Sequence, residues 1–308
     1  MRAAVVGAGA IGAAFDVPGQ PNPMTHAGGY RAANCELVAL VDTAESVVQE
    51  AERWGARPYH DLSRMLVECR PEVISFAVPA TPRPALMLQA LACESVRTVI
   101  AEKPLATTSS AARAVIDAFR ERRVPLIVNY SRRFVPFWQE IAGRLAISAT
   151  IKYAKGIVHN GSHAIDLCRM LFGECLGMRA ISSKHDFWPD DPTVTARLSF
   201  EGCPEVILQS MDERCFTLFE VDIVGADWRA VVHHDGRLAR LYQLQEGAGI
   251  PPGRRLVQIA ERDTGSDEAM IRLIRHALEV ARGGAVACSG EDALEALVIA
   301  EHLSEGGV

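Results

Sequence analysis

The sequence predicts an α/β domain with a parallel sheet, followed by an α+β domain built on a large open, mainly antiparallel sheet. In the first part of the chain, short apolar runs alternate with amphipathic stretches of helical length, the pattern of a parallel sheet covered by helices. After Asn129 the pattern changes to period-two stretches, which indicate antiparallel strands with one buried face. We therefore divide the 308 residues into domains 1–128 and 129–308, and expect that the last helix can return to the first domain.

The elements of the first domain follow from the apolar runs and from the residues that flank them. We expect strands at Ala3–Val6, Leu37–Val41, Val73–Ala77, Thr98–Ala101 and Pro125–Val128. We expect helices at Glu45–Trp54, Asp61–Cys69, Pro84–Ala92 and Thr107–Arg122.

The second domain begins with a helix, Ser162–Phe172, and continues as strands. We expect the strands at Thr193–Phe200, Glu205–Met211, Phe216–Val224, Trp228–His233 and Leu238–Leu244. The glycines and prolines of Glu246–Arg255 predict a loop. Two helices close the chain, because Ser266 and Ser289 can each cap a helix start; the first runs to about Arg282 and the second covers Glu291–Leu303.

Composition excludes several classes of protein. The chain is 49% hydrophobic and 23% charged, as in globular proteins, and its net charge of −6 argues against a nucleic-acid partner. No apolar stretch has the length of a membrane span, and Met1-Arg2 leads directly into a strand, so we expect no signal peptide, no membrane partner and a cytoplasmic location. The eight cysteines are scattered without zinc-site spacing, which predicts reduced thiols, no disulfide and no metal.

A Gly-x-Gly-x-x-Gly pattern, with Ala10 and Ile11 between its last two glycines, follows the first strand. Gly7 permits a tight turn, Gly9 lets the backbone approach a pyrophosphate, and Gly12 allows close packing of the following helix. The second strand ends in Asp42, whose carboxylate can accept hydrogen bonds from ribose hydroxyls and would repel a 2′-phosphate. The combination predicts a Rossmann dinucleotide-binding domain that takes NAD, with NADP possible.

Asp42 comes later than the usual interval of about 20 residues after the glycines. The inserted segment, Asp16–Gly29, accounts for the delay, because its prolines and glycines cannot continue a helix. We expect a loop beside the cofactor. Two interpretations remain: a lid or substrate-contacting segment that makes His26 available, or a tolerated surface insertion.

The tripeptide Glu102-Lys103-Pro104, here called the E-K-P motif, follows the apolar run Thr98–Ala101. A lysine at the carboxyl end of a buried strand lies where open α/β sheets bind ligands, and Pro104 ends the strand. Alone, the motif is equally consistent with a solvated strand end. Together with the glycine pattern, the motif indicates a lysine near nicotinamide. The positive charge of nicotinamide and the partial burial of the lysine would both lower the pKa of Lys103.

Four segments resemble the Gfo/Idh/MocA oxidoreductases, the family of glucose–fructose oxidoreductase and inositol dehydrogenase. The segments are Val5-Val6-Gly7-Ala8-Gly9-Ala10-Ile11-Gly12, Leu40-Val41-Asp42, Ala101-Glu102-Lys103-Pro104-Leu105-Ala106 and His159-Asn160-Gly161-Ser162-His163-Ala164-Ile165-Asp166-Leu167. The resemblance extends over essentially the whole chain. It implies hydride transfer between nicotinamide and a carbon of a sugar, nucleotide sugar or cyclitol, and a homodimer or homotetramer.

The resemblance also implies that Lys103 and His163 manage the hydroxyl proton, since an imidazole suits general acid–base chemistry near neutrality. The alternative for His163 is a core or helix-capping histidine. Asp166, three residues later, shares its helix face and is either a supporting or an ordinary structural residue. One departure is His159, which stands where many members carry aspartate and cannot carry that negative charge. We include His159 among the catalytic candidates and Asn160 among the substrate-binding ones.

Further candidates lie at strand ends or near the expected domain junction. Tyr130, Arg132 and Arg133 begin the second domain, and either arginine can hold a phosphate or carboxylate or remain solvated. The family resemblance assigns Val78 and Pro79, with Glu102 and Lys103, to the dinucleotide site, and Arg83 stands where relatives often have a histidine. Trp188, Asp190 and Asp191 predict a turn that either reaches the site or is only a turn.

The sequence therefore predicts an NAD(P)-dependent dehydrogenase or reductase that acts on CH–OH groups. Two alternatives keep the dinucleotide but change the function. One is an NAD-dependent glycosidase that uses transient oxidation, and the other is a non-catalytic dinucleotide-binding sensor.

Overall fold

The computed structural model describes residues 1–248 and 253–306, which form two compact units. The first unit contains Met1–Phe134 and Asp267–Glu295, and the second contains Val135–Ser266 and the described residues from Ala296 on. A single cut between 128 and 129 therefore differs from these units, because a segment near the carboxyl terminus folds with the first one.

The first unit is built on a six-stranded parallel sheet in the order β3-β2-β1-β4-β5-β6. Every residue of β4 and β5 is buried, because helices cover both faces of such a sheet. The order reverses between β1 and β4, and this arrangement confirms the predicted Rossmann sheet. The strands are β1 Arg2–Val6, β2 Glu36–Val41, β3 Arg57–Tyr59, β4 Val73–Phe76, β5 Thr98–Ala101 and β6 Leu126–Val128.

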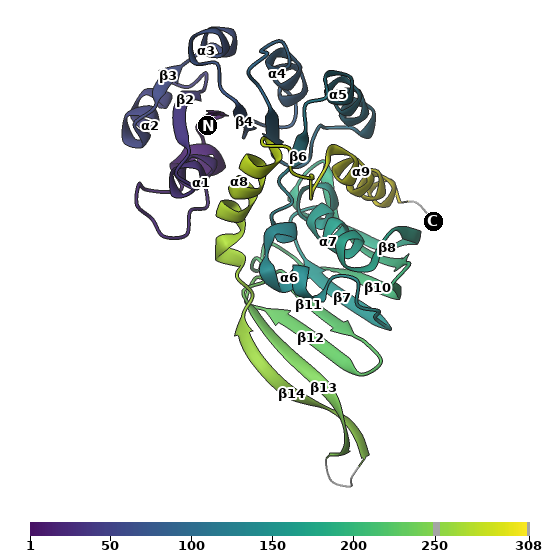
Figure 1. The fold of residues 1–308 in the computed structure, drawn as a ribbon. Coiled ribbons are helices and arrows are strands. Elements are labelled where there is room, and N and C mark those ends of the chain that lie inside the picture. The colour runs from purple at the N-terminus through teal and green to yellow at the C-terminus, as the bar shows by residue number, and fades with distance from the viewer. Residues whose placement is uncertain (249–252, 307–308) are drawn as a thin grey trace. The chain divides into compact units, whose positions relative to one another are not determined.

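Helices α3, α4 and α5 line one face of this sheet, while α1 and α8 lie side by side on the other (Figure 1). Local capping sets two of the helix starts: Asp61 accepts a hydrogen bond from the Arg64 amide, and Thr108 from the Ala111 amide. The helical segments are η1 Ala10–Ala14, α1 His26–Ala32, α2 Val47–Trp54, α3 Leu62–Cys69, α4 Arg83–Ala90, α5 Ser109–Arg122, η2 Ser131–Phe134 and α8 Ala269–Val280.

Helix α1 corrects the expectation of a loop through Gly29. The helix begins at His26, and both Gly28 and Gly29 lie inside it. A Cβ atom at Gly29 would lie 2.7 Å from Cγ1 of Ile274 on α8, so the missing side chain lets the two helices approach. This packing outweighs the helix penalty of glycine, about 1 kcal/mol relative to alanine.

The second unit is built on an eight-stranded sheet in the order β14-β13-β12-β11-β7-β10-β9-β8. The β7–β10 pair is parallel and the other pairs are antiparallel, which confirms the predicted mainly antiparallel sheet. The strands are β7 Ser148–Tyr153, β8 Cys175–Trp188, β9 Asp191–Phe200, β10 Cys203–Ser210, β11 Glu220–Val224, β12 Trp228–His233, β13 Leu238–Ala248 and β14 Gly253–Asp263.

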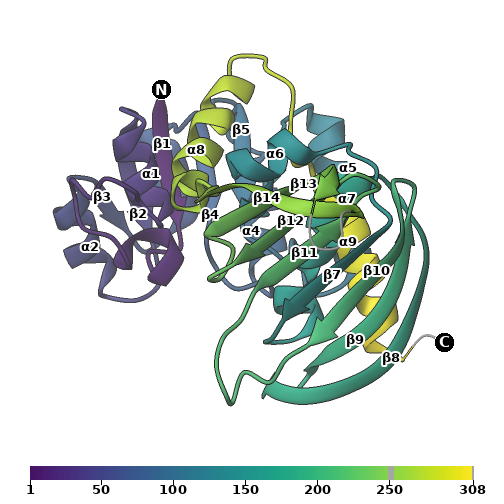
Figure 2. The ribbon, with the colours of Figure 1, turned by 90° about the horizontal axis from the view of Figure 1, so that it is seen from below.

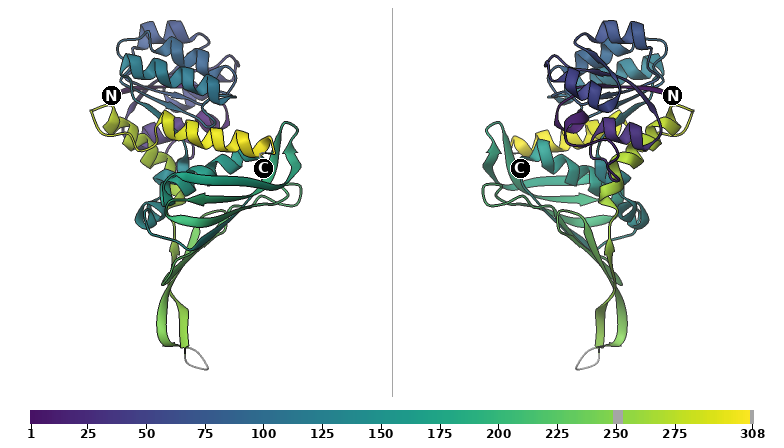
Figure 3. Two further views of the ribbon diagram at one scale, coloured as in Figure 1. Left: turned by 90° about the vertical axis from the view of Figure 1, so that its right-hand side faces the viewer. Right: turned by 90° about the vertical axis from the view of Figure 1, so that its left-hand side faces the viewer.

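Helix α7 lies along one face of this sheet (Figure 2), and the β13–β14 hairpin extends beyond the other strands (Figure 3). The unit also contains α6 Pro136–Ile141, η3 Ile157–Gly161 and α7 Ser162–Phe172. No helix in the described part of the chain has the length and apolar character needed to cross a membrane.

The loop predicted at Glu246–Arg255 is, in its described part, the end of a hairpin. Strand β13 continues through Ala248 and β14 begins at Gly253. Residues 249–252 of that prediction lie outside the described residues. The prediction was wrong for the strand residues because β14 is an edge strand whose side chains are mostly exposed, so no buried face produces a period-two pattern.

The two caps expected near the carboxyl terminus differ in outcome. Ser289 Oγ accepts a hydrogen bond from the Asp292 amide, and the Asp292 carboxylate accepts one from the Ser289 amide, so this start of α9, Gly290–Ser304, is confirmed. Ser266 instead begins the short helical turn η4, Ser266–Glu268, and Glu268 precedes α8 without a capping bond from its side chain.

The close approach of α1 to α8 predicts that Gly29→Val lowers the free energy of unfolding by about 1–3 kcal/mol, because the new side chain overlaps Ile274. Ala32→Val, at a half-exposed position of the same helix, carries the same β-branched penalty and should cost less. Urea denaturation of both variants checks this. Equal losses would contradict the packing explanation.

Candidate active site

The predicted cofactor residues of the first unit meet at one edge of its sheet. They follow strands whose carboxyl ends point to the same side, because all strand pairs are parallel. Ligands of open α/β sheets bind at this edge, near the reversal in strand order. The residues are Gly7, Gly9, Ala10, Ile11 and Gly12 after β1, Asp42 after β2, Val78 and Pro79 after β4, and Glu102 and Lys103 after β5.

The glycine turn after β1 has the geometry that a dinucleotide requires. Gly7 has φ +97°, and a Cβ atom there would lie 2.7 Å from the carbonyl carbon of Ala77. A Cβ atom at Gly12 would lie 1.8 Å from the Gly7 oxygen, so neither position admits a side chain. At Gly9, by contrast, no atom lies within 4 Å of the Cβ position. The turn is closely packed at Gly7 and Gly12 and open at Gly9, which fits a pyrophosphate lying against the backbone at Gly9.

The carboxylate of Asp42 binds this turn to the end of β2. Its Oδ2 atom accepts a hydrogen bond from the Ala8 amide at 2.7 Å, and Oδ1 accepts one from the Ala44 amide at 3.0 Å. Each carboxylate oxygen keeps a second lone pair. Asp42 is thus able to hold the glycine turn and still accept hydrogen bonds from ribose hydroxyls.

Arg83, whose contribution the sequence left open, joins the ends of β4 and β5. Its side chain is 3% exposed, and its guanidinium donates hydrogen bonds to the carbonyl oxygens of Val78, Glu102 and Pro104. Burial lowers the pKa of Arg83 to about 10, and the nearby Glu102 charge opposes this shift. Arg83 is therefore protonated at neutral pH and fixes the backbone on both sides of Lys103.

The Glu102 side chain is anchored by two polar neighbours. Its Oε1 atom accepts hydrogen bonds from His26 Nε2 at 3.0 Å and from Asn129 Nδ2 at 2.6 Å. Burial alone would raise the pKa of Glu102, but these hydrogen bonds and the charges of His26 and Lys103 lower it. Sequence reasoning missed Asn129, although its place directly after β6, at the same sheet edge, could have indicated it.

In the second unit, the segment after β7 carries the remaining catalytic candidates. His159 and Asn160 lie in η3, which leads directly into α7 with His163 and Asp166. His163 and Asp166 are both buried, whereas His159 is exposed. Asn160 donates a hydrogen bond to the Ala154 oxygen at 2.9 Å and so closes its own turn.

Residues of the predicted turn at Trp188–Asp191 contact η3. The Asp191 carboxylate accepts hydrogen bonds from the amides of Val158 at 2.9 Å and His159 at 2.8 Å. The rings of His159 and Trp188 lie 4.9 Å apart. The β8–β9 hairpin therefore sets the position of η3, and Asp190, exposed at the turn, is not part of these contacts.

A second carboxylate of the hairpin, Asp186, was missed by sequence reasoning. It accepts hydrogen bonds from the Thr193 hydroxyl at 2.6 Å and from the amides of Lys155 and Glu213 at 3.1 Å. Burial alone would raise the pKa of Asp186, but these hydrogen bonds lower it. Asp186 thereby joins the loops that follow β7 and β10. These loops are neighbours because β7 and β10 pair in parallel, and the sequence does not reveal that pairing.

Comparison with known proteins agrees with this geometry. Residues 1–130 match the model of the GFO_IDH_MocA oxidoreductase family, described as an NAD-binding Rossmann fold. The amino-terminal 130 residues are thus similar to the NAD-binding domain of the Gfo/Idh/MocA oxidoreductases. A D-apiose dehydrogenase of Paraburkholderia graminis is 25% identical over 86% of this chain and 79% of its own length. An inositol 2-dehydrogenase of Rubrobacter xylanophilus is 32% identical over 39% of this chain and 34% of its own length.

Solved structures extend the likeness of fold to the whole chain. A UDP-N-acetylglucosamine 3-dehydrogenase from Acidithiobacillus ferrooxidans has a TM-score of 0.79 and 20% identity, covering 99% of this chain and 97% of that one. A levoglucosan dehydrogenase in complex with NADH and L-sorbose also has a TM-score of 0.79, with 17% identity over 100% of this chain and 96% of that one. The amino-terminal domain of this chain is an NAD-binding Rossmann domain of the kind found in oxidoreductases.

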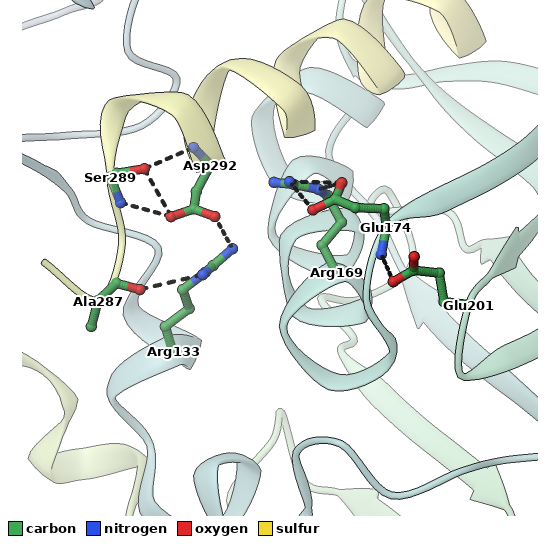
Figure 4. Close-up of polar contacts among 7 residues, drawn as sticks. All are labelled: Arg133, Arg169, Glu174, Glu201, Ala287, Ser289 and Asp292. Atoms are coloured by element: carbon green, nitrogen blue, oxygen red, sulfur yellow. Dashed lines mark hydrogen bonds and ion pairs between the residues drawn. The ribbon is translucent and has the colours of Figure 1, made fainter.

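The structure also shows the surroundings of the three candidates predicted at the start of the second domain. Arg133 donates hydrogen bonds to Asp292 at 3.2 Å and to the Ala287 oxygen at 3.3 Å, so it supports the cap of α9 (Figure 4). Tyr130, the second residue after β6, is fully buried, and Arg132 is half-buried in η2. The contacts of Arg133 favour a structural role over the bidentate anion site that the sequence suggested.

Figure 4 also shows an ion pair within the second unit. Arg169 of α7 binds both carboxylate oxygens of Glu174, at 2.8 and 2.9 Å, and the Glu174 amide donates to Glu201 at 3.1 Å. These contacts fix the carboxyl end of α7, the helix that carries His163 and Asp166 near its start.

The two amides bound by Asp191 predict that Asp191→Ala lowers the free energy of unfolding by about 1–3 kcal/mol, because both donors lose their partner. Asp190→Ala, at the exposed neighbour, should stay within about 0.5 kcal/mol of the unchanged protein. Guanidinium denaturation of the pair measures the difference. A loss in Asp190→Ala as large as that in Asp191→Ala would contradict the assigned contacts.

Proposed function

We propose that the chain transfers a hydride between NAD and a hydroxyl-bearing carbon of a sugar, nucleotide sugar or cyclitol. The observation that carries this proposal is the E-K-P motif, held at the carboxyl end of β5 by Arg83 and by the anchored Glu102. The glycine turn lies at the same sheet edge, so Lys103 belongs to the cofactor side of the site. The names of the relatives, dehydrogenases of D-apiose and inositol, support the substrate class and net oxidation.

Oxidation of a secondary alcohol removes a hydride from carbon and a proton from oxygen. When bound, NAD supplies the hydride acceptor. We assign the proton to Lys103, whose amine takes it from the substrate hydroxyl. By family resemblance His163 also serves proton transfer, with Asp166 one turn later on α7 as its supporting residue. His159 remains a catalytic candidate and Asn160 a candidate for contact with substrate, because both lie in the turn that leads into α7.

We infer that NAD is preferred to NADP, because the Asp42 carboxylate would face a 2′-phosphate with like charge. Asp42 is held in place by the Ala8 and Ala44 amides, so it cannot turn away without breaking them. We also propose, as the family resemblance implies, a homodimer or homotetramer.

The proton role of Lys103 predicts that Lys103→Met lowers kcat by about 100-fold or more, because a positioned base typically contributes 10²–10⁴. The measurement is NADH formation across a panel of sugars, cyclitols and nucleotide sugars. Lys184→Met, at a half-exposed lysine of β8, is the matched control and should keep normal turnover. An active Lys103→Met protein would remove the proposed role. Substrate consumption without NADH formation would instead support the glycosidase alternative.

The charge of Asp42 predicts that Asp42→Asn shifts the preference between NAD and NADP toward NADP by about tenfold, the effect of about 1.4 kcal/mol. The comparison is kcat/KM with each cofactor. Glu45→Ala removes a nearby carboxylate whose side chain is 92% exposed, and it should leave the preference unchanged. A wild-type protein that favours NADP would contradict the assignment at the outset.

A further inference from the structure

The inserted segment brings a histidine into the interior rather than over the surface. His26, the first residue of α1, has a fully buried side chain, and its Nε2 atom lies 3.0 Å from Glu102 Oε1. The Nδ1 atom has no hydrogen-bond partner among the described residues, so the ring makes its polar contact with Glu102 through Nε2. From sequence alone, His26 belongs either to a lid or substrate-contacting segment or to a tolerated surface insertion.

A single buried carboxylate closes the loop that precedes His26. Asp16 accepts hydrogen bonds from the Thr25 amide at 2.6 Å, the Thr25 hydroxyl at 2.7 Å and the Met24 amide at 2.9 Å. Thr25 in turn caps α1 by accepting a hydrogen bond from the Gly28 amide at 3.0 Å. The two ends of the loop are thus tied to each other, and His26 follows directly at a fixed place.

The same helix is anchored one turn later. Tyr30, also fully buried, makes a 2.8 Å hydrogen bond with the Ser75 hydroxyl of β4. Residues four apart project from the same face of a helix, so His26 and Tyr30 both face the sheet. The Tyr30–Ser75 hydrogen bond therefore holds α1 against the sheet without His26. The contact of His26 with Glu102 joins the same helix to the E-K-P motif.

Loss of His26 would change the surroundings of the Glu102 charge, which is largely removed from water. Glu102 would keep Asn129 but lose one of two hydrogen-bond donors, and a buried carboxylate is costly unless its partners are complete. The side chain would then turn toward water or bind a proton. Because Lys103 is the next residue, a change in the Glu102 conformation displaces the lysine amine.

We propose that His26 is a positioning residue that places the Lys103 amine by holding the Glu102 carboxylate. This inference rests on the proposed function, because it takes Lys103 as the group that accepts the substrate proton. It assigns the inserted segment the task of delivering His26 to the E-K-P motif.

The test compares His26→Leu, which removes the donor but retains bulk, with His26→Gln, whose amide nitrogen can still donate to Glu102. We expect kcat of His26→Leu to fall about 10- to 100-fold, the cost of a displaced catalytic group, with KM and the NADH dissociation constant within about twofold. His26→Gln should recover most of the loss. Tyr30→Phe is the matched control, since it deletes a buried hydrogen bond of the same helix and should lower stability with kcat unchanged.

A double-mutant cycle tests whether His26 acts through Glu102. In a Glu102→Gln background, His26→Leu should cause little further loss of kcat, because the charge that His26 holds is already absent. This background also removes the buried unpaired charge, so the cycle remains measurable if His26→Leu alone folds poorly. Additive losses, or a folded His26→Leu protein with normal kcat, would overturn the proposal.

A readout that needs no turnover separates this proposal from the proposed function. Lys103 is one of four lysines in the chain, the others being Lys152, Lys155 and Lys184. Acetylation by acetic anhydride, followed by mass spectrometry, gives the reactivity of Lys103 relative to those three. We expect His26→Leu to change this ratio by about threefold or more and His26→Gln to restore it. An unchanged ratio overturns the positioning role, whereas an active Lys103→Met protein with a changed ratio overturns only the proton role.

Discussion

The carboxylate of Glu102 at the end of β5, whose side chain is only 13% exposed, is the constraint on which the candidate site depends. Removing such a group from water is costly unless hydrogen bonds replace its hydration. Glu102 meets this requirement with side chains from α1 and from the residue after β6, while Arg83 satisfies the carbonyl oxygens beside it. The contacts that allow the charge to be buried are therefore the contacts that set the chain path through Lys103. Stability and placement of the lysine have the same physical origin.

Single carboxylates order the other functional loops in the same way. Their shared feature is that each accepts main-chain amides from a loop, as seen for Asp16, Asp42, Asp186 and Asp191. Hydrogen bonds to an ionised acceptor are about twice as strong as neutral ones. Loops that lack a neighbouring strand can thus be held by one acidic residue, which leaves their side chains available for ligands.

The sequence could predict the parallel sheet and its ligand-binding edge because both depend on local patterns. Buried strands are apolar on both faces, and the glycine turn and the E-K-P motif each lie next to one. Helix α1 could not be predicted, because Gly29 is tolerated only through its packing on Ile274, far away in the chain. The edge strand β14 exposes most of its side chains and therefore carries no periodicity. The His26–Glu102 and Asp191–His159 contacts likewise join distant segments, which residue spacing alone does not reveal.

The turn that carries His159 shows why an uncharged side chain suits this position. An aspartate there would add a second negative charge to a turn whose amides at Val158 and His159 already bind the Asp191 carboxylate. Like charges in such proximity disfavour the ionised form of both groups. The exposed imidazole avoids this repulsion and packs its ring near Trp188 instead. In this chain the negative charge at the turn thus comes from Asp191 of β9, whose carboxylate accepts hydrogen bonds from the two amides of the turn.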